Sequence, residues 1–170
     1  MSNAILIGPP GAGKSSVARS LGKLINKPVL DTDLLVEERC GKSISDIFIE
    51  DGESFFRGEE LKVLLEAIQD ENSILALGGG SILSEEAREA LISSKRPIVF
   101  LDVSISNAAP RVGFNKDRPL LTINPRQQWL GLMETRRPIY ESLATITLNT
   151  DNRKPVEVAQ ELAQKLEFLT

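Results

Sequence analysis

The most constraining feature of the sequence is a glycine-rich segment near its start, Gly8-Pro9-Pro10-Gly11-Ala12-Gly13-Lys14-Ser15. It matches the pattern G-x-x-x-x-G-K-[ST], whose glycines let backbone N–H groups converge on phosphate oxygens without steric clash. The apolar run at residues 4–7 predicts a buried strand before it, and residues 14–26 have helical spacing after it. A glycine turn with a capping serine would explain neither Lys14 nor the spacing, so the segment predicts a phosphate-binding loop.

The residue types in this loop indicate how it would hold a nucleotide. Lys14 can reach the outer phosphates, and the hydroxyl of Ser15 can bind Mg²⁺. The helix that follows points the positive end of its dipole at the same place. The nucleotide-binding residues predicted here are Gly11, Ala12, Gly13, Lys14, Ser15 and Ser16.

Short apolar runs alternate with helical patterns along the rest of the chain. Further strands are expected at residues 28–30, 73–77, 98–101 and 145–148, and helices at 53–69, after Ser84, at 125–142 and from Pro155. This alternation predicts an α/β fold in which a parallel sheet is covered by helices on both faces. Residues 111–119 are polar and predict a loop, and Pro138 is expected to kink or interrupt its helix. Because no repeat or linker divides the sequence, we expect residues 1–170 to form a single domain.

Charge and residue composition limit the functional classes and the cellular compartment that we expect for this protein. The net charge is −4, so we expect no general affinity for nucleic acid or for a membrane surface. The sequence has no histidine, which excludes histidine-based acid–base catalysis and histidine metal sites. The single cysteine, Cys40, cannot form an internal disulfide, and no signal-peptide pattern or long apolar stretch is evident. We therefore expect a cytoplasmic protein.

A phosphate-binding loop is shared by GTPases, ATPases and kinases. The segment Asn115-Lys116-Asp117-Arg118 approaches the guanine-reading pattern N-K-x-D, but arginine stands in the aspartate position and no strand precedes it. Motor and remodelling ATPases need a larger domain. A small chain with a basic loop favours a kinase that closes over its substrate.

Three aspartates are candidates for the chemistry of phosphoryl transfer. Asp31 and Asp33 follow a predicted strand and are separated by one residue, so alternation points both to the same side. One could hold Mg²⁺ and the other a substrate hydroxyl, whereas helix N-capping is the alternative for either residue. Asp102, which ends the apolar run 98–101, is a rival metal ligand with a strand-end cap as its alternative.

Two further features stay ambiguous when each is taken alone. Gly78-Gly79-Gly80 follows a predicted strand and would let a ligand approach the backbone closely, but a flexible connection is the alternative. Arg57 lies early in a predicted helix, behind Phe55 and Phe56, where an isolated arginine would usually be a solvated charge.

Taken in order, these motifs resemble those of the shikimate kinase family over essentially the whole chain. The motifs are Asp31-Thr32-Asp33, Asp51-Gly52-Glu53 with Phe56-Arg57, Gly78-Gly79-Gly80, Arg118-Pro119-Leu120-Leu121 and Arg136-Arg137-x-x-Tyr140. The resemblance implies transfer of the γ-phosphoryl group of ATP, with Mg²⁺, to the 3-hydroxyl of shikimate on the route to chorismate and the aromatic amino acids. It also implies a three-layer αβα fold like that of nucleoside monophosphate kinases, with a five-stranded sheet in the order 2-3-1-4-5. A lid is implied at about residues 112–123 and a substrate-binding segment at about residues 33–62.

The resemblance also implies roles for individual residues. The implied catalytic residues are Lys14, Asp33 and Arg118, and the implied Mg²⁺ ligands are Ser15 and Asp31. The implied substrate-binding residues are Asp33, Phe48, Phe56, Arg57, Gly78, Gly79, Gly80 and Arg136, with Glu60 orienting an arginine. Nucleotide contacts beyond the loop are implied for Arg111, Arg118, Arg153 and Pro155. Arginine suits both tasks, because its planar group binds carboxylates in a bidentate manner and stacks on an adenine ring.

Two other functions remain open at this point. Another small-molecule kinase, of the gluconate or nucleoside monophosphate type, is the closest alternative, although Arg57 and Arg136 suit a carboxylate better than a base. A catalytically inactive homologue that acts as a binding or regulatory module is a different class. Such a protein would have lost Lys14, Asp33 or Arg118, and all three are present. We expect the small molecule to be the main partner and the protein to be a monomer.

Overall fold

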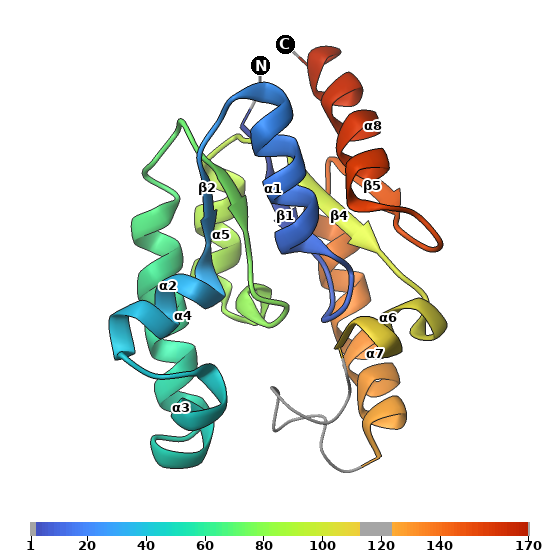
Figure 1. The fold of residues 1–170 in the computed structure, drawn as a ribbon. Helices are drawn as coiled ribbons and strands as arrows, with labels where there is room; N and C mark the ends of the chain where they lie inside the picture. The colour runs from blue at the N-terminus through green and yellow to red at the C-terminus, as the bar shows by residue number, and fades with distance from the viewer. Residues whose placement is uncertain (1–2, 113–123, 170) are drawn as a thin grey trace.

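The computed structural model of the chain describes residues 3–112 and 124–169 (Figure 1). Five strands form one parallel sheet in the order β2-β3-β1-β4-β5, which confirms the predicted fold class and strand order. The strands are β1 (Ile5–Ile7), β2 (Val29–Asp31), β3 (Ile74–Ala76), β4 (Ile98–Asp102) and β5 (Ile146–Asn149). The helices are α1 (Lys14–Ile25), α2 (Thr32–Cys40), α3 (Ile44–Glu50), α4 (Glu53–Ala67), the 3₁₀ turn η1 (Ser81–Leu83), α5 (Glu85–Ser93), α6 (Ile105–Val112), α7 (Pro125–Leu143) and α8 (Pro155–Glu167).

The main core lies around the three central strands. β1 and β3 are buried along their whole length and β4 up to its last residue, as expected for strands covered on both faces. Figure 1 shows α1 in front of the sheet beside α8, and α5 and α7 behind it. The buried face of α1 consists of Val17, Ala18 and Leu21, spaced as an amphipathic helix requires.

A second, smaller core lies beyond the β2 edge of the sheet. It contains Val36, Ile47, Phe56 and Val63, which come from α2, α3 and α4. These helices carry most of the predicted substrate-binding segment at residues 33–62. Their apolar contacts with one another hold this segment together, and α4 also packs into the main core through Leu64 and Ala67.

Two sequence-based expectations are wrong. The loop expected at residues 111–119 does not include Arg111 or Val112, which form the last turn of α6, while residues 113–119 lie outside the described part. α7 also runs through Pro138 without interruption. Proline removes one backbone donor from a helix, but Met133, Arg136 and Tyr140 are buried around this point and hold both halves against the sheet.

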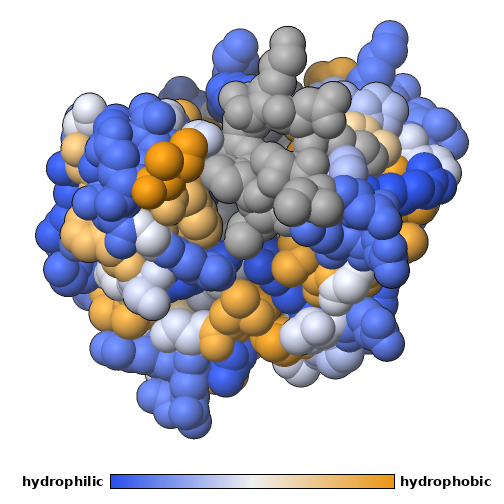
Figure 2. Space-filling model, turned by 90° about the horizontal axis from the view of Figure 1, so that it is seen from below, coloured by the Kyte–Doolittle hydropathy of each residue, from blue (hydrophilic) through white to orange (hydrophobic). Residues whose placement is uncertain are grey.

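The predicted functional residues gather at the carboxyl edge of the sheet, where ligands bind in open α/β folds. Figure 2 views the molecule from this end and shows hydrophilic residues that separate several small hydrophobic patches. Within residues 3–112 and 124–169, no helix is long and apolar enough to span a membrane.

Candidate active site

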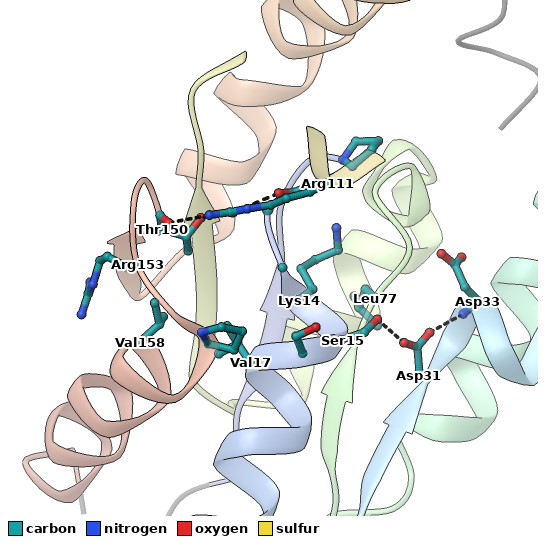
Figure 3. Close-up of a pocket in the computed structure, with 16 residues that line it drawn as sticks. Lys14, Ser15, Val17, Asp31, Asp33, Leu77, Arg111, Thr150, Arg153 and Val158 are labelled. Carbon is teal, nitrogen blue, oxygen red and sulfur yellow. Dashed lines mark hydrogen bonds between the residues drawn. The ribbon is translucent and has the colours of Figure 1, made fainter. Parts of the chain in front are cut away.

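A cavity of about 360 Å³ lies at the carboxyl edge, between the phosphate-binding loop and the start of α8 (Figure 3). Its lining residues are Pro10, Gly11, Ala12, Gly13, Lys14, Ser15, Ser16, Val17, Asp31, Asp33, Leu77, Arg111, Thr150, Arg153, Pro155 and Val158. The cavity thus brings together every predicted nucleotide-binding residue except Arg118. Arg118 and nearly all of the expected lid lie outside the described residues.

Backbone conformation explains the glycines of the loop. Gly11 and Gly13 have φ angles of 83° and 87°, in the left-handed region that residues with a Cβ atom rarely adopt. At Gly11 an added Cβ would also lie 2.8 Å from the carbonyl oxygen of Ala108 in α6. The ammonium group of Lys14 donates to the carbonyl oxygens of Gly8 (2.8 Å) and Pro9 (2.9 Å), so it lies over the loop.

Asp31 caps helix α2 and also contacts Ser15 of the phosphate-binding loop. Its Oδ1 accepts the backbone N–H groups of Asp33 (3.0 Å) and Leu34 (3.4 Å), which caps the N-terminus of α2. Its Oδ2 accepts a hydrogen bond from the hydroxyl of Ser15 (Figure 3). The capping bonds therefore fix the carboxylate beside Ser15, and two hard oxygen donors meet at one point of the cavity.

The rival carboxylate, Asp102, has a structural role. At the end of β4 it accepts a bidentate pair of hydrogen bonds from Arg137 (2.8 and 2.9 Å), and its Oδ1 also accepts the backbone N–H of Val103 (2.8 Å). Asp102 is absent from the lining of the described cavity. The geometry therefore supports the strand-end cap that the sequence offered as the alternative.

Thr150 organises the side of the cavity expected to take the adenine ring. Arg111 donates to the carbonyl (2.9 Å) and the hydroxyl (3.1 Å) of Thr150 and to the carbonyl of Gly11 (3.2 Å). Arg153 is paired with Glu161 of α8 (2.7 Å). The sequence analysis missed Thr150, for which the only available signal was its position directly after β5.

Two of the three glycines after β3, Gly78 and Gly80, make room for charged side chains. A Cβ on Gly78 would lie 2.5 Å from Oδ1 of Asp33 and 2.9 Å from Oε2 of Glu60, and a Cβ on Gly80 would overlap the guanidinium of Arg57. Arg57 in turn donates to Oε1 of Glu60 (2.9 Å). Glu60 is 3% exposed, and its burial raises the pKa of its carboxyl group, an effect that the nearby Arg57 opposes.

Arg136 is 5% exposed, and the positive charge of Arg57 lies close enough to influence it. Burial is the main cause that lowers the pKa of Arg136, and Arg57 lowers it further, while Tyr140 and Glu60 raise it. Glu60 balances the charge of Arg57 directly, whereas Arg136 is desolvated and only partly compensated by Tyr140 and Glu60. The surroundings of Arg136 are therefore suited to a further anion such as a carboxylate.

The two predicted substrate phenylalanines are placed differently from the charged residues. Phe56 is 4% exposed in the second core, its ring centroid lies 4.9 Å from that of Phe48, and the guanidinium of Arg57 lies 5.3 Å from its ring. The cation–π contact with Phe56 helps to fix the position of the Arg57 guanidinium. Contact between either phenylalanine and an acceptor stays a prediction.

Comparison with known proteins agrees with this geometry. A family model described as shikimate kinase matches residues 10–167. A shikimate kinase of Rhodococcus jostii is 44% identical over 164 residues, which is 96% of each chain. A shikimate kinase of Thermobifida fusca is 46% identical over 163 residues, which is 96% of this chain and 94% of that one.

The same family appears among solved structures. A shikimate kinase from Acinetobacter baumannii in complex with shikimate superposes with a TM-score of 0.95 and 34% identity, covering 100% of this chain and 95% of that one. Sequence and structure thus agree over nearly the full length of the molecule. The chain belongs to the shikimate kinase family.

Proposed function

We infer that the chain transfers the γ-phosphoryl group of ATP to the 3-hydroxyl of shikimate, giving shikimate 3-phosphate and ADP on the route to chorismate. The observation that carries this inference is the pair formed by buried Arg136 and half-buried Arg57. Arg57 contacts Glu60, and Glu60 lies near Asp33, which also lines the phosphate-binding cavity. Shikimate has one carboxylate for the two arginines and three hydroxyls. Membership of the family supports ATP as the co-substrate.

The side chains suggest how the transfer would proceed. The carboxylate of Asp33 accepts a hydrogen bond from the acceptor hydroxyl and takes its proton as the new O–P bond forms and the bond to the ADP oxygen breaks. Lys14 neutralises charge on the phosphoryl oxygens. Arg118, outside the described residues, is proposed to do the same from the lid.

Ser15 and Asp31 fit a magnesium ion. Their oxygens are hard donors in hydrogen-bonding contact at the phosphate end of the cavity, and Mg²⁺ is usually held by one or two protein oxygens together with water and phosphate. When bound, the ion would supply charge neutralisation at the phosphates. Ser15 and Asp31 would fix its position.

The wider setting of this activity is also a proposal. The net charge of −4 and the single cysteine support a cytoplasmic enzyme without nucleic-acid or membrane partners. A single domain of residues 1–170 that acts as a monomer is consistent with one continuous sheet.

A coupled assay of ADP release tests the function. Purified protein with ATP and Mg²⁺ is supplied with shikimate, quinate, gluconate, AMP or CMP in separate reactions. We expect turnover with shikimate. Turnover with gluconate or a nucleotide, and none with shikimate, would instead establish the alternative small-molecule kinase.

A further inference from the structure

Helix α7 touches both halves of the active site at the carboxyl edge. Near its start, the indole N–H of Trp129 donates to the carbonyl oxygen of Pro10 in the phosphate-binding loop (2.9 Å). Three turns later, the hydroxyl of Tyr140 donates to the carbonyl oxygen of Gly79 (2.6 Å). Eleven residues separate the two side chains, which places them about 16 Å apart along the helix.

Pro10 and Gly79 are themselves in contact. A Cβ added to Gly79 would lie 3.2 Å from Cδ of Pro10 and 3.4 Å from the carbonyl oxygen of Gly8, so the two backbones pack closely. Pro10 belongs to the loop that holds the phosphoryl donor, and Gly79 lies between the two glycines that accommodate Asp33 and Arg57. The contact therefore joins the donor site to the acceptor site.

The hydrogen bonds of Trp129 and Tyr140 are both buried, and the Tyr140 ring is held by packing against a neighbouring ring. Trp129 is 3% exposed and Tyr140 is fully buried, with its ring stacked on Phe100 at a centroid distance of 5.1 Å. Within the loop, the carbonyls of Gly8 and Pro9 accept from Lys14, and that of Pro9 also accepts from the backbone N–H of Ala12. The Pro10 carbonyl accepts instead from Trp129, a donor outside the loop.

We propose that Trp129 and Tyr140 act together as positioning residues that clamp Pro10 against Gly79 and so set the separation between the γ-phosphate and the acceptor hydroxyl. Neither side chain needs to touch a substrate for this role. Phosphoryl transfer depends steeply on alignment, since a small displacement of the reacting groups costs a large factor in rate. This inference rests on the proposed function for the identity of the acceptor.

Two variants remove the hydrogen bonds and keep the rings, Trp129→Phe and Tyr140→Phe. The single-turnover rate of phosphoryl transfer is measured with ATP and shikimate both saturating, and the dissociation constants of ADP and shikimate are measured separately. We expect each variant to lose about tenfold in rate while the dissociation constant of ADP changes less than about twofold. The dissociation constant of shikimate should also hold in Trp129→Phe, whereas Tyr140→Phe additionally removes the hydrogen bond of Tyr140 with Arg136 and should weaken shikimate binding. Because both bonds act on one contact, the double variant should fall little further than the slower single variant, not by the product of the two.

Thr145→Val is the matched control for a loss of stability alone. The Thr145 hydroxyl exchanges two hydrogen bonds with the backbone of Ile98 (3.0 and 3.1 Å) at the opposite end of β4. This variant should lower the melting temperature and leave the rate unchanged, with the smaller loss of stability because Thr145 is exposed and its backbone N–H still donates to the Ile98 carbonyl. Trp129 is the only tryptophan in the sequence, so its fluorescence in the wild-type protein also reports directly whether ADP reaches the loop.

The outcomes separate the two inferences. Wild-type protein without turnover on shikimate would overturn the proposed function, and the variants would then be assayed with the acceptor that the wild type does use. Unchanged rates in both phenylalanine variants, multiplicative losses in the double variant, or a change confined to one dissociation constant would overturn the positioning role while leaving the function intact.

Discussion

The arginines around the site differ in how their charges are balanced. Arg137 is paired with Asp102, and Arg153 with Glu161, both at less than 3 Å. Arg136 is instead buried, with Arg57 as a cationic neighbour. Paired arginines of this kind stabilise local structure, whereas Arg136 gains a strong partner when an anionic ligand arrives.

Replacement of Lys14 by alanine tests the role of a single side chain of the phosphate-binding loop in phosphoryl transfer. The ammonium lies over the carbonyls of Gly8 and Pro9, where it can meet charge that develops on the transferred group. We expect Lys14→Ala to lower kcat by about 10²–10³. Lys23→Ala, on the exposed side of α1, is the control and should have wild-type kinetics. Near wild-type turnover of Lys14→Ala at saturating ATP would contradict the assigned role.

Asp31 and Asp33 should respond differently to magnesium. Asp33→Asn removes the proposed proton acceptor and should lower kcat by about 10² or more at any Mg²⁺ concentration. Asp31→Asn keeps an oxygen beside Ser15 but loses the charge, so it should raise the Mg²⁺ requirement and recover partly with excess metal. Steady-state turnover of both variants across a Mg²⁺ titration distinguishes them, and the reverse pattern would mean that the two roles are exchanged.

At the scale of elements, the sequence predicted those parts that carry strong local signals. The phosphate-binding loop, the five strands and the long helices were recognisable because their patterns are continuous. Helices α2 and α3 were not expected, since each is short and α2 has only Thr32 and Val36 buried. The contact of Trp129 with Pro10 joins residues 119 positions apart, and no local pattern encodes such a contact.

A substitution at Gly80 tests whether the turn after β3 must leave room for Arg57. Its φ of −94° suits alanine, but the added Cβ would overlap the Arg57 guanidinium. Because that guanidinium is the end of a flexible side chain, it would move away and leave both Glu60 and the acceptor. We expect Gly80→Ala to raise the KM for shikimate by about 10- to 100-fold with little change in the KM for ATP.

The control for this substitution is Gly131→Ala in α7. No atom lies within 4 Å of the Cβ that would be added there, so the change should stabilise the protein by about 0.5–1 kcal/mol through helix propensity and leave the kinetics unchanged. Steady-state kinetics and thermal unfolding of Gly80→Ala and Gly131→Ala test these two expectations. A Gly80→Ala enzyme with normal affinity for shikimate would show that Arg57 need not occupy its observed position.

At the scale of the whole molecule, the parallel topology assembles the site. Every strand ends at the same edge, so the loop after β1, Asp31 at the end of β2, the glycines after β3 and Thr150 after β5 all lie there. The opposite edge is tied by Arg96, which donates to the backbone carbonyls of Asn3, Asp70 and Ser73. A half-buried arginine, Arg96, and a buried one, Arg136, thus lie at opposite ends of one sheet.

These two arginines should have opposite effects on stability. Burial lowers the pKa of both Arg96 and Arg136, but only Arg96 is compensated by three carbonyl oxygens. Arg96→Met would remove the Arg96 donor from these carbonyls, although that of Asp70 keeps its bonds from Ser73, and should cost about 2–3 kcal/mol. Arg136→Met removes a desolvated charge next to Arg57, so the ligand-free protein should be as stable as the wild type or more stable by about 1 kcal/mol.

Thermal unfolding with and without shikimate measures both effects. The wild type and Arg96→Met should gain melting temperature when shikimate is added, since a ligand that binds only the folded state stabilises it by mass action. Arg136→Met should show little gain, because its carboxylate site is lost, although its own melting temperature is equal to that of the wild type or about 2–4 °C higher. A large drop in the melting temperature of ligand-free Arg136→Met would mean that Arg136 serves the fold rather than the acceptor.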